Sequence, residues 1–212
     1  MRVGIIGSGR IGGNAGKLLA RAGHEVMFSF SRDPEKLEGL ATEAGNDARA
    51  GTPREAAGFG DVVMLSVPWR LVDEALEAAG PLDGRILLDT TNHFGPTGLE
   101  ELPDGLTAAQ TNQRRAPGVR LVKAYNTLTA GFQAEAAGRA GPDRGVMFVC
   151  GDDEEAKRVV AGLIDDSGFT PVDMGGLADA APMEAPRRPG AVYGEEYHEV
   201  EAREFVARLG DR

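Results

Sequence analysis

The stretch that decides the fold is RVGIIGSGRIG, residues 2–12. It opens with a short apolar run that is typical of a buried strand. The residues that follow carry apolar side chains at the spacing of one helical face, namely Ile11, Ala15, Leu18, Leu19 and Ala22. Gly23 stands where a helix commonly ends, and residues 24–30 have the composition of a second strand. The sequence therefore predicts a strand, a tight turn, a helix and a second strand.

The three glycines of this turn have the spacing of a dinucleotide-binding fingerprint. Gly7 is expected to make the tight turn, Gly9 to let a phosphate approach the backbone, and Gly12 to let the helix pack on the strand. The free N–H groups at the start of the helix attract anions. Glycine triplets also occur in ordinary turns, but their place between a strand and a helix favours a dinucleotide site.

The end of the second strand distinguishes NAD from NADP. NAD sites usually carry an acidic residue there, which binds the ribose 2′-hydroxyl. This chain reads SFSRDPEK at that point, so Ser31, Arg32 and Lys36 can bind a 2′-phosphate. Asp33 is expected to cap the next helix, with Pro34 at its first position. The segment favours NADP, and Asp33 keeps NAD as an alternative.

The composition indicates one globular α/β domain. The chain has 212 residues, 42% of them hydrophobic, a single cysteine and a net charge of −10. The negative charge argues against nucleic acid as a partner. The lone Cys150 lies in an apolar strand and fits a reducing compartment. With no apolar run of membrane-spanning length and a strand that begins at residue 2, we expect a cytoplasmic protein with no membrane partner.

Strands and helices alternate along most of the chain. The expected strands are residues 2–6, 24–30, 48–50, 61–67, 85–89, 120–124, 145–150 and 169–172. The expected helices include residues 35–42, 53–58, 69–79 and 195–209, with another after residue 151. Residues 93–119 are expected to form a long irregular connection. This alternation predicts a doubly wound parallel sheet, the Rossmann fold.

A change in composition marks a short C-terminal extension. Residues 1–176 are expected to form the dinucleotide-binding domain, and residues 177–212 to pack on that domain or on a partner in a homodimer. The extension has prolines at 182, 186 and 189, and its helix offers a modest apolar stripe of Tyr197, Val200, Phe205, Val206 and Leu209. This stripe is too small for the extension to fold alone.

Ligands of such sheets bind at the carboxyl ends of the strands. The segments expected there are Gly7–Gly12, Ser31-Arg32, Val67-Pro68-Trp69, Thr91-Asn92-His93 and 124–130. The candidate proton donors are His93, Tyr125, Tyr193, Tyr197 and His198, each of which has a commoner structural explanation, so no catalytic residue is assigned. The acidic residues 152–155 are interpreted as the usual complement of a helix dipole and not as metal ligands.

Several segments together resemble the NADPH-dependent reductases of coenzyme F420, a deazaflavin. The resemblance covers the chain from residue 1 to about 178. It is carried by residues 2–12, 23–26, Ser31-Arg32, Val67-Pro68-Trp69, Asn92, 123–127, 150–153 and 171–175. It implies hydride transfer between NADP(H) and a deazaflavin, with F420 as the co-substrate.

The resemblance also implies roles for individual residues. It assigns the pyrophosphate to Ser8, Gly9, Arg10 and Ile11, the 2′-phosphate to Ser31, Arg32 and Lys36, the ribose and nicotinamide side to Val67 and Asn92, and the stacked rings to Leu128 and Ala130. The chain departs from the family at residues 181–196, which are proline-rich and charged where relatives are often apolar. The residues alone leave two alternatives open: a reductase of a small carbonyl or imine compound, and a non-catalytic NADP-binding sensor.

Overall fold

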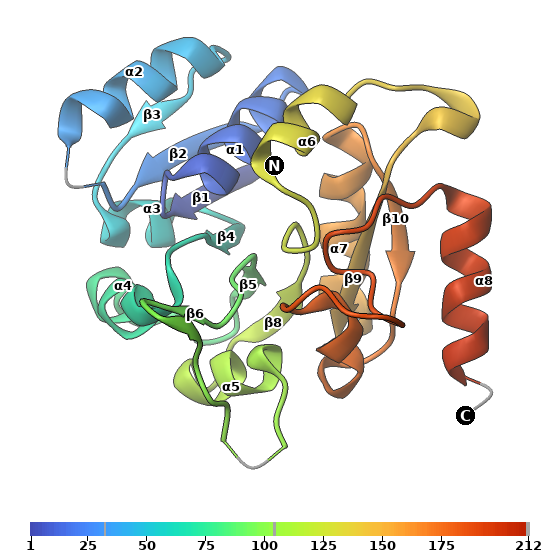
Figure 1. The fold of residues 1–212 in the computed structure, drawn as a ribbon. Helices are drawn as coiled ribbons and strands as arrows, with labels where there is room; N and C mark the ends of the chain where they lie inside the picture. Colours follow the sequence, from blue (N-terminus) through green and yellow to red (C-terminus); the bar gives the residue numbers. More distant parts are fainter. Residues whose placement is uncertain (32, 104, 211–212) are drawn as a thin grey trace.

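The first strand lies in the interior of one eight-stranded sheet (Figure 1). The structure is a computed structural model that describes residues 1–31, 33–103 and 105–210. Within these residues the strand order is β10-β9-β8-β5-β4-β1-β2-β3. The bounds are β1 Arg2–Ile6, β2 Glu25–Ser29, β3 Arg49–Ala50, β4 Val62–Leu65, β5 Ile86–Asp89, β8 Arg120–Lys123, β9 Val146–Gly151 and β10 Thr170–Asp173. A separate hairpin pairs β6 (Phe94–Gly95) with β7 (Gly98–Leu99).

The order β3-β2-β1-β4-β5-β8 is that of dinucleotide-binding folds, and all its neighbours pair in parallel. The α/β fold class is therefore confirmed, with one difference. Strand β9 pairs antiparallel with β8, and β10 runs parallel to β9. The connection from β8 does not cross back to the amino ends of the strands, so β9 starts beyond the carboxyl end of β8 and runs in the opposite direction.

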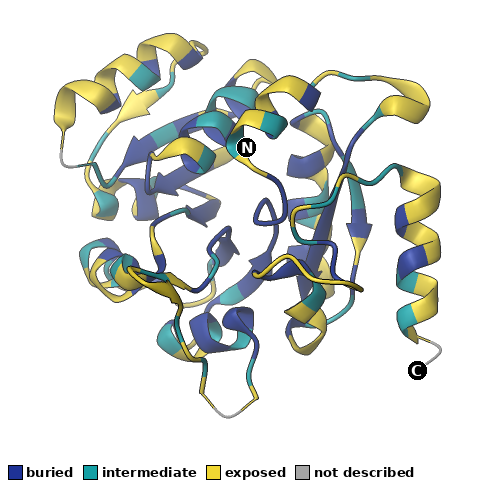
Figure 2. Ribbon diagram, viewed as in Figure 1, coloured by how far each residue is buried: buried dark blue, intermediate teal, exposed yellow. Residues whose placement is uncertain are grey.

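Helices cover both faces of the sheet. One face carries α1 (Arg10–Arg21), α2 (Pro34–Ala44), α6 (Ala130–Ala136) and α7 (Glu154–Asp166). The other carries α3 (Pro53–Phe59), α4 (Val72–Ala79), α5 (Ala108–Arg115) and α8 (Glu199–Gly210). The chain also forms three short 3-10 helices within the described residues: η1 (Trp69–Leu71), η2 (Gly141–Asp143) and η3 (Leu177–Met183). Figure 2 shows the central strands as the buried layer between these helices.

Alternating side chains of the inner strands supply both hydrophobic cores. Val3 and Ile5 of β1 belong to the core beneath α1, whereas Ile6 belongs to the core beneath α4. All three are fully buried. Burying such a side chain contributes roughly 1.5–3 kcal/mol, and strands buried on both faces are typical of parallel sheets. The apolar runs in the sequence are nearly continuous because the inner strands are buried on both faces.

Two helices were not predicted from the sequence. Residues 93–119 contain the β6–β7 hairpin and α5, where an irregular connection was expected. The start of α5 has a capping box, in which Thr107 accepts a hydrogen bond from the Gln110 backbone and the Gln110 side chain accepts one from Thr107. This Thr-x-x-Gln signature is visible in the sequence. Helix α6 was also missed, although Thr129 caps it.

The C-terminal extension packs against its own chain. The ring of Tyr197 stacks edge-on against Phe148 and Phe205, with centroids 5.5 and 5.8 Å apart. Val192 is fully buried in the same core. The expected apolar stripe is partly wrong, because Val200 is 70% exposed. The other four members of the stripe, Tyr197, Phe205, Val206 and Leu209, pack in or against this core as expected.

A buried ion cluster fixes this extension to the sheet. The Lys123 ammonium at the end of β8 lies 2.9 Å from the carboxylate of Asp89 and 3.8 Å from that of Glu184. Glu184, in the extension, also accepts hydrogen bonds from the backbone N–H groups of Ala108 and Ala109 at the start of α5. Burial opposes the charge on Lys123, but the two carboxylates outweigh it and hold the pKa of Lys123 above its usual value. The ammonium therefore stays charged in the fold.

We expect Lys123→Met to lower the free energy of unfolding by about 3–5 kcal/mol, because it leaves two buried carboxylates without a cation. Denaturant titration followed by circular dichroism measures the change. Adding Asp89→Asn and Glu184→Gln should recover part of the loss, since those carboxylates no longer need a counter-charge. An unchanged unfolding midpoint in Lys123→Met would contradict this role.

Candidate functional site

The turn between β1 and α1 is tight enough to require its glycines. Gly7 has φ +107°, and a Cβ there would overlap the carbonyl oxygen of Ser66. A Cβ on Gly12 would overlap the carbonyl oxygen of Gly7, whereas one on Gly9 would meet no atom within 4 Å. The structural tasks expected of Gly7 and Gly12 are therefore confirmed. The backbone at Gly9 is open to approach, and its contact with a cofactor stays a prediction.

The N-terminus of α1 is left without a side-chain cap. Gly9 occupies the cap position, and the first turn of the helix holds no acidic residue. By contrast, the side chains of Asp33, Thr52 and Asp153 cap α2, α3 and α7. The N–H groups of the first turn of α1 are thus available to an anion, and the helix dipole favours one there.

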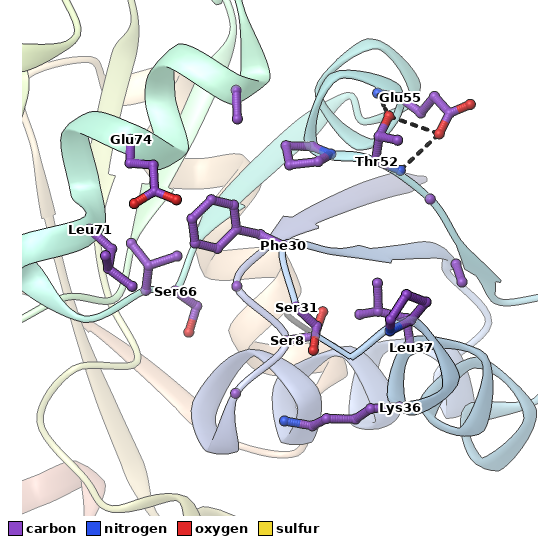
Figure 3. Close-up of a pocket in the computed structure, with 18 of the residues that line it drawn as sticks. Ser8, Phe30, Ser31, Lys36, Leu37, Thr52, Glu55, Ser66, Leu71 and Glu74 are labelled. Atoms are coloured by element: carbon purple, nitrogen blue, oxygen red, sulfur yellow. Dashed lines mark hydrogen bonds between the residues drawn. The ribbon is translucent and has the colours of Figure 1, made fainter.

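A cavity of about 900 Å³ opens in front of this turn. Its lining includes seven of the residues predicted from the sequence: Gly7, Ser8, Gly9, Ser31, Lys36, Val67 and Pro68. They come from the carboxyl ends of β1, β2 and β4 and from the start of α2. In Figure 3, Ser8, Ser31 and Lys36 lie on one side of the cavity and Leu71 and Glu74 on the other.

The remaining predicted residues do not line this cavity. Gly12, Arg10 and Ile11 lie in the first turn of α1, behind the glycine turn. Asn92 and Ala130 lie farther along the sheet edge, after β5 and at the start of α6. Arg32 lies outside the described residues. Binding of the cofactor by these residues stays a prediction.

Charges of both signs stand around the cavity. Asp33, the carboxylate that the sequence offers to an NAD ribose, accepts a hydrogen bond from the Lys36 backbone N–H at 3.3 Å. It thereby fulfils the capping role that its position predicts. Lys36 and Arg70 both line the cavity, and neither forms an ion pair with any residue that the structure describes. Glu38, Glu55 and Glu74 line the same cavity, so the part of it that suits an anion is the part at Lys36 and the uncapped start of α1.

Sequence reasoning missed several lining residues. Phe30 lines the cavity with a left-handed backbone, φ 58°, and its ring lies toward Leu71 and Glu74 in Figure 3. Thr52 lines it from the loop after β3. Phe30 and Thr52 follow the carboxyl ends of strands, which is the signal that could have identified them.

A hydrogen-bonded network closes the sheet edge beyond the cavity. The Asn92 amide donates to the Asn126 backbone carbonyl at 2.9 Å, and its oxygen accepts from Ala185 N–H at 3.2 Å. Asn126 in turn donates to the Met183 carbonyl at 2.7 Å. The side-chain oxygen of Asn126 is buried and has no partner among the described residues. The extension thus fixes both asparagines beside the ends of β5 and β8.

Most of the candidate proton donors are held in structural roles. The Tyr125 hydroxyl donates to the Leu163 carbonyl at 3.0 Å and lies 2.8 Å from the Ser167 hydroxyl, and burial raises the pKa of Tyr125 far above its usual value. Burial lowers the pKa of His93, so its ring is neutral near pH 7. Burial likewise raises the pKa of Cys150 to about 12, which removes it as a nucleophile.

The three candidate proton donors in the C-terminal extension differ in their surroundings. Tyr197 packs in the core, and His198 lies 3.5 Å from the Arg144 carbonyl, on the side of β9. Tyr193 alone is partly exposed near the ends of β5 and β8, where its ring lies 6.3 Å from that of Phe94. Asp153, from the acidic run, caps α7 and pairs with Arg120, as a helix-dipole interpretation predicts.

Comparison with known proteins shows which proteins the chain resembles. Residues 2–93 match the family described as NADP oxidoreductase, coenzyme F420-dependent. The chain is 33% identical to the metalloreductase STEAP3 of Rattus norvegicus over 186 residues. These aligned residues make up 87% of this chain and 36% of STEAP3. The chain thus spans about a third of that relative. It is 28% identical to the F420-dependent NADP reductase of Methanocaldococcus jannaschii over 202 residues, 87% of this chain and 88% of the relative.

A solved structure is similar over nearly the whole chain. It is a hypothetical protein of Sinorhizobium meliloti, with a TM-score of 0.79 and 29% identity over 94% of this chain and 95% of the other. The resemblance noted in the sequence is confirmed: the chain is similar to NADP-dependent oxidoreductases, the F420-dependent enzymes among them. No helix in the described ranges combines the length and apolar character needed to cross a bilayer.

We expect Lys36→Ala to weaken NADPH binding about tenfold and to leave NADH binding nearly unchanged, because only NADPH carries the 2′-phosphate. The sequence predicts the same selectivity for Arg32→Ala. Isothermal titration with both cofactors measures the ratio. Arg21→Ala, at the far end of α1, is the matched control. Equal losses for NADPH and NADH would show that Lys36 does not contact the 2′-phosphate.

Proposed function

We propose that this chain transfers a hydride between NADP(H) and a deazaflavin coenzyme of the F420 type. The observation that carries the proposal is a cavity at the uncapped start of α1, lined by Ser31 and Lys36, beside a sheet edge at which the Tyr125 hydroxyl is bound to Leu163 and burial lowers the pKa of His93. The family match and the reductase of M. jannaschii support the choice of acceptor.

The cavity fits the adenosine and phosphate portion of NADP(H). Its volume of about 900 Å³ lies within the usual range of ligand pockets. The uncapped turn of α1 would hold the pyrophosphate through backbone N–H groups, next to the open face of Gly9. Ser31 and Lys36 would bind the 2′-phosphate, with Arg32 predicted from the sequence to join them. Phe30 and Leu71 offer an apolar wall for the adenine.

The nicotinamide would extend along the sheet edge toward Asn92. This residue is already oriented by its bonds to Asn126 and Ala185, so it needs little reorganisation when a ligand arrives. The unpartnered oxygen of Asn126 lies in the same network. Val67 and Pro68 connect the cavity to this edge, since both line the cavity at the end of β4. An extended dinucleotide would pass the end of β4 on its way from the cavity to the end of β5.

The chemistry that the bound cofactor supplies is transfer of a hydride, with its electron pair, from C4 of the dihydronicotinamide to C5 of the deazaflavin, whose ring nitrogen takes a proton from solvent. The protein has to align two rings and exclude water, and it needs no acid of its own. Small and buried residues after β8, such as Ala124 and Leu128, suit that task. Reduction of a carbonyl or imine would instead need a positioned donor.

The proposal predicts that NADPH is oxidised by coenzyme F420 faster than by simple ketones, imines or quinones. Stopped-flow absorbance at matched acceptor concentrations measures the rates. His93→Gln should keep most of the F420 activity, because hydride transfer to a deazaflavin uses no acid from the protein. For a carbonyl or imine reductase that used His93, the same change would cost on the order of 10²–10⁴ in rate.

Two outcomes would contradict the proposal. One is a higher rate with a carbonyl or imine compound than with F420, together with loss of that rate in His93→Gln. The other is tight NADPH binding with no oxidation by any acceptor, which would favour the non-catalytic sensor. Tyr125→Phe serves as the control for structural damage, since its hydroxyl faces α7 and not the sheet edge.

A further inference from the structure

An exposed aromatic pair stands at the sheet edge where the acceptor would approach. Among the described residues, the large apolar side chains left exposed are Met1, Phe94, Leu99 and Val200. Phe94 is 48% exposed and pairs with Leu99 across the β6–β7 hairpin. The ring of Tyr193 lies against Phe94, with centroids 6.3 Å apart and planes inclined by 52°. Two aromatic rings from distant parts of the chain thus meet on an open surface.

The position of the pair is fixed by the ends of two neighbouring strands. Phe94 begins β6 two residues after Asn92, which follows the end of β5. Gly194, next to Tyr193, donates its backbone N–H to the Thr127 carbonyl at 2.8 Å, in the loop after β8. Because β5 and β8 are adjacent, the pair stands above their carboxyl ends. Figure 1 shows the extension crossing this part of the sheet before it reaches α8.

The 3-10 helix η1 connects the aromatic pair to the cofactor cavity. Leu71 of η1 lines the cavity, and Trp69 of η1 packs edge-on against His93, with ring centroids 6.2 Å apart. His93 immediately precedes Phe94. A dinucleotide that runs from the cavity toward Asn92 would therefore place its nicotinamide next to Phe94 and Tyr193.

Tyr193 is held in place by the ion cluster described above. Glu184 anchors the extension to Lys123 and α5, and the backbone N–H groups of Val192 and Tyr193 both donate to the Pro182 carbonyl. Val192 is fully buried. Tyr193 is partly buried, and within the described ranges its hydroxyl makes no hydrogen bond. The ring is thus preorganised, and its hydroxyl is left unbonded by the residues that the structure describes.

We propose that Phe94 and Tyr193 form the surface on which the tricyclic ring of the hydride acceptor stacks. This inference rests on the proposed function and adds the residues that select a planar acceptor. Aromatic faces bind planar heterocycles by offset stacking, and a rigid platform loses little entropy on binding. A second copy of the chain is a poorer occupant, because stable interfaces bury roughly 20–30 residues a side and this patch comprises one short hairpin and one loop.

The test measures binding without turnover. Oxidised coenzyme F420 is titrated into the protein saturated with NADP⁺, a pair that cannot react, and quenching of F420 fluorescence is recorded. We expect the double variant Phe94→Leu with Tyr193→Leu to weaken F420 about tenfold and to leave NADP⁺ affinity unchanged. Tyr193→Phe should retain wild-type affinity, because it keeps the ring. Val200→Ala, an exposed apolar residue on α8, is the matched control.

The outcomes separate this inference from the proposed function. Unchanged F420 affinity in the double variant overturns the platform, even if wild-type protein oxidises NADPH with F420. Weakened binding in the double variant supports the platform, even if the wild type shows no turnover and the proposed function fails. Absence of F420 binding to wild-type protein overturns the platform. Unchanged NADP⁺ affinity in every variant verifies that the fold is intact.

Discussion

The close approach of α1 to β1 at Gly7 and Gly12 is the constraint from which the rest of the site follows. With no Cβ at either position, the helix begins directly against the strand, and its uncapped first turn faces the cavity. The same contact sets Ser66 and Val67 of the neighbouring strand end against the turn. One steric requirement therefore aligns the helix dipole, the open backbone of Gly9 and two walls of the cavity.

The buried cluster of Lys123, Asp89 and Glu184 organises the opposite half of the sheet edge. Burying an isolated charge in a protein interior is costly. These three charges are tolerated because the Lys123 ammonium pairs with both carboxylates, and Glu184 also accepts hydrogen bonds from the N–H groups that begin α5. Through Glu184, the cluster holds the polar, proline-rich extension against the domain. Residues 181–196 thus have a structural role, since Ala185 of this segment donates to the Asn92 side chain and Tyr193 packs against Phe94.

Local chemistry made much of the fold predictable from the sequence. The glycine turn, the cap at Asp33 and the apolar runs of the inner strands depend on neighbouring residues, and each appears where the sequence indicated. The role of Glu184 could not be predicted, because its partners lie far away along the chain and an acidic residue in a charged segment normally faces solvent. The antiparallel direction of β9 could not be predicted either, because its apolar sequence fits a strand of either direction. Phe30 could not be assigned to the cavity, because an apolar residue at the end of a strand is commonly buried in the core.

The central claim is that this edge of the sheet aligns a nicotinamide with a deazaflavin for direct hydride transfer. The most direct measurement uses NADPH deuterated at C4, in each of its two stereoisomers, with oxidised F420 in ordinary water. The account predicts that one isomer delivers its deuterium to C5 of reduced F420, where mass spectrometry and proton NMR detect it, and that the other isomer delivers none. Reduced F420 without deuterium from either isomer, or deuterium lost to solvent, would contradict the claim.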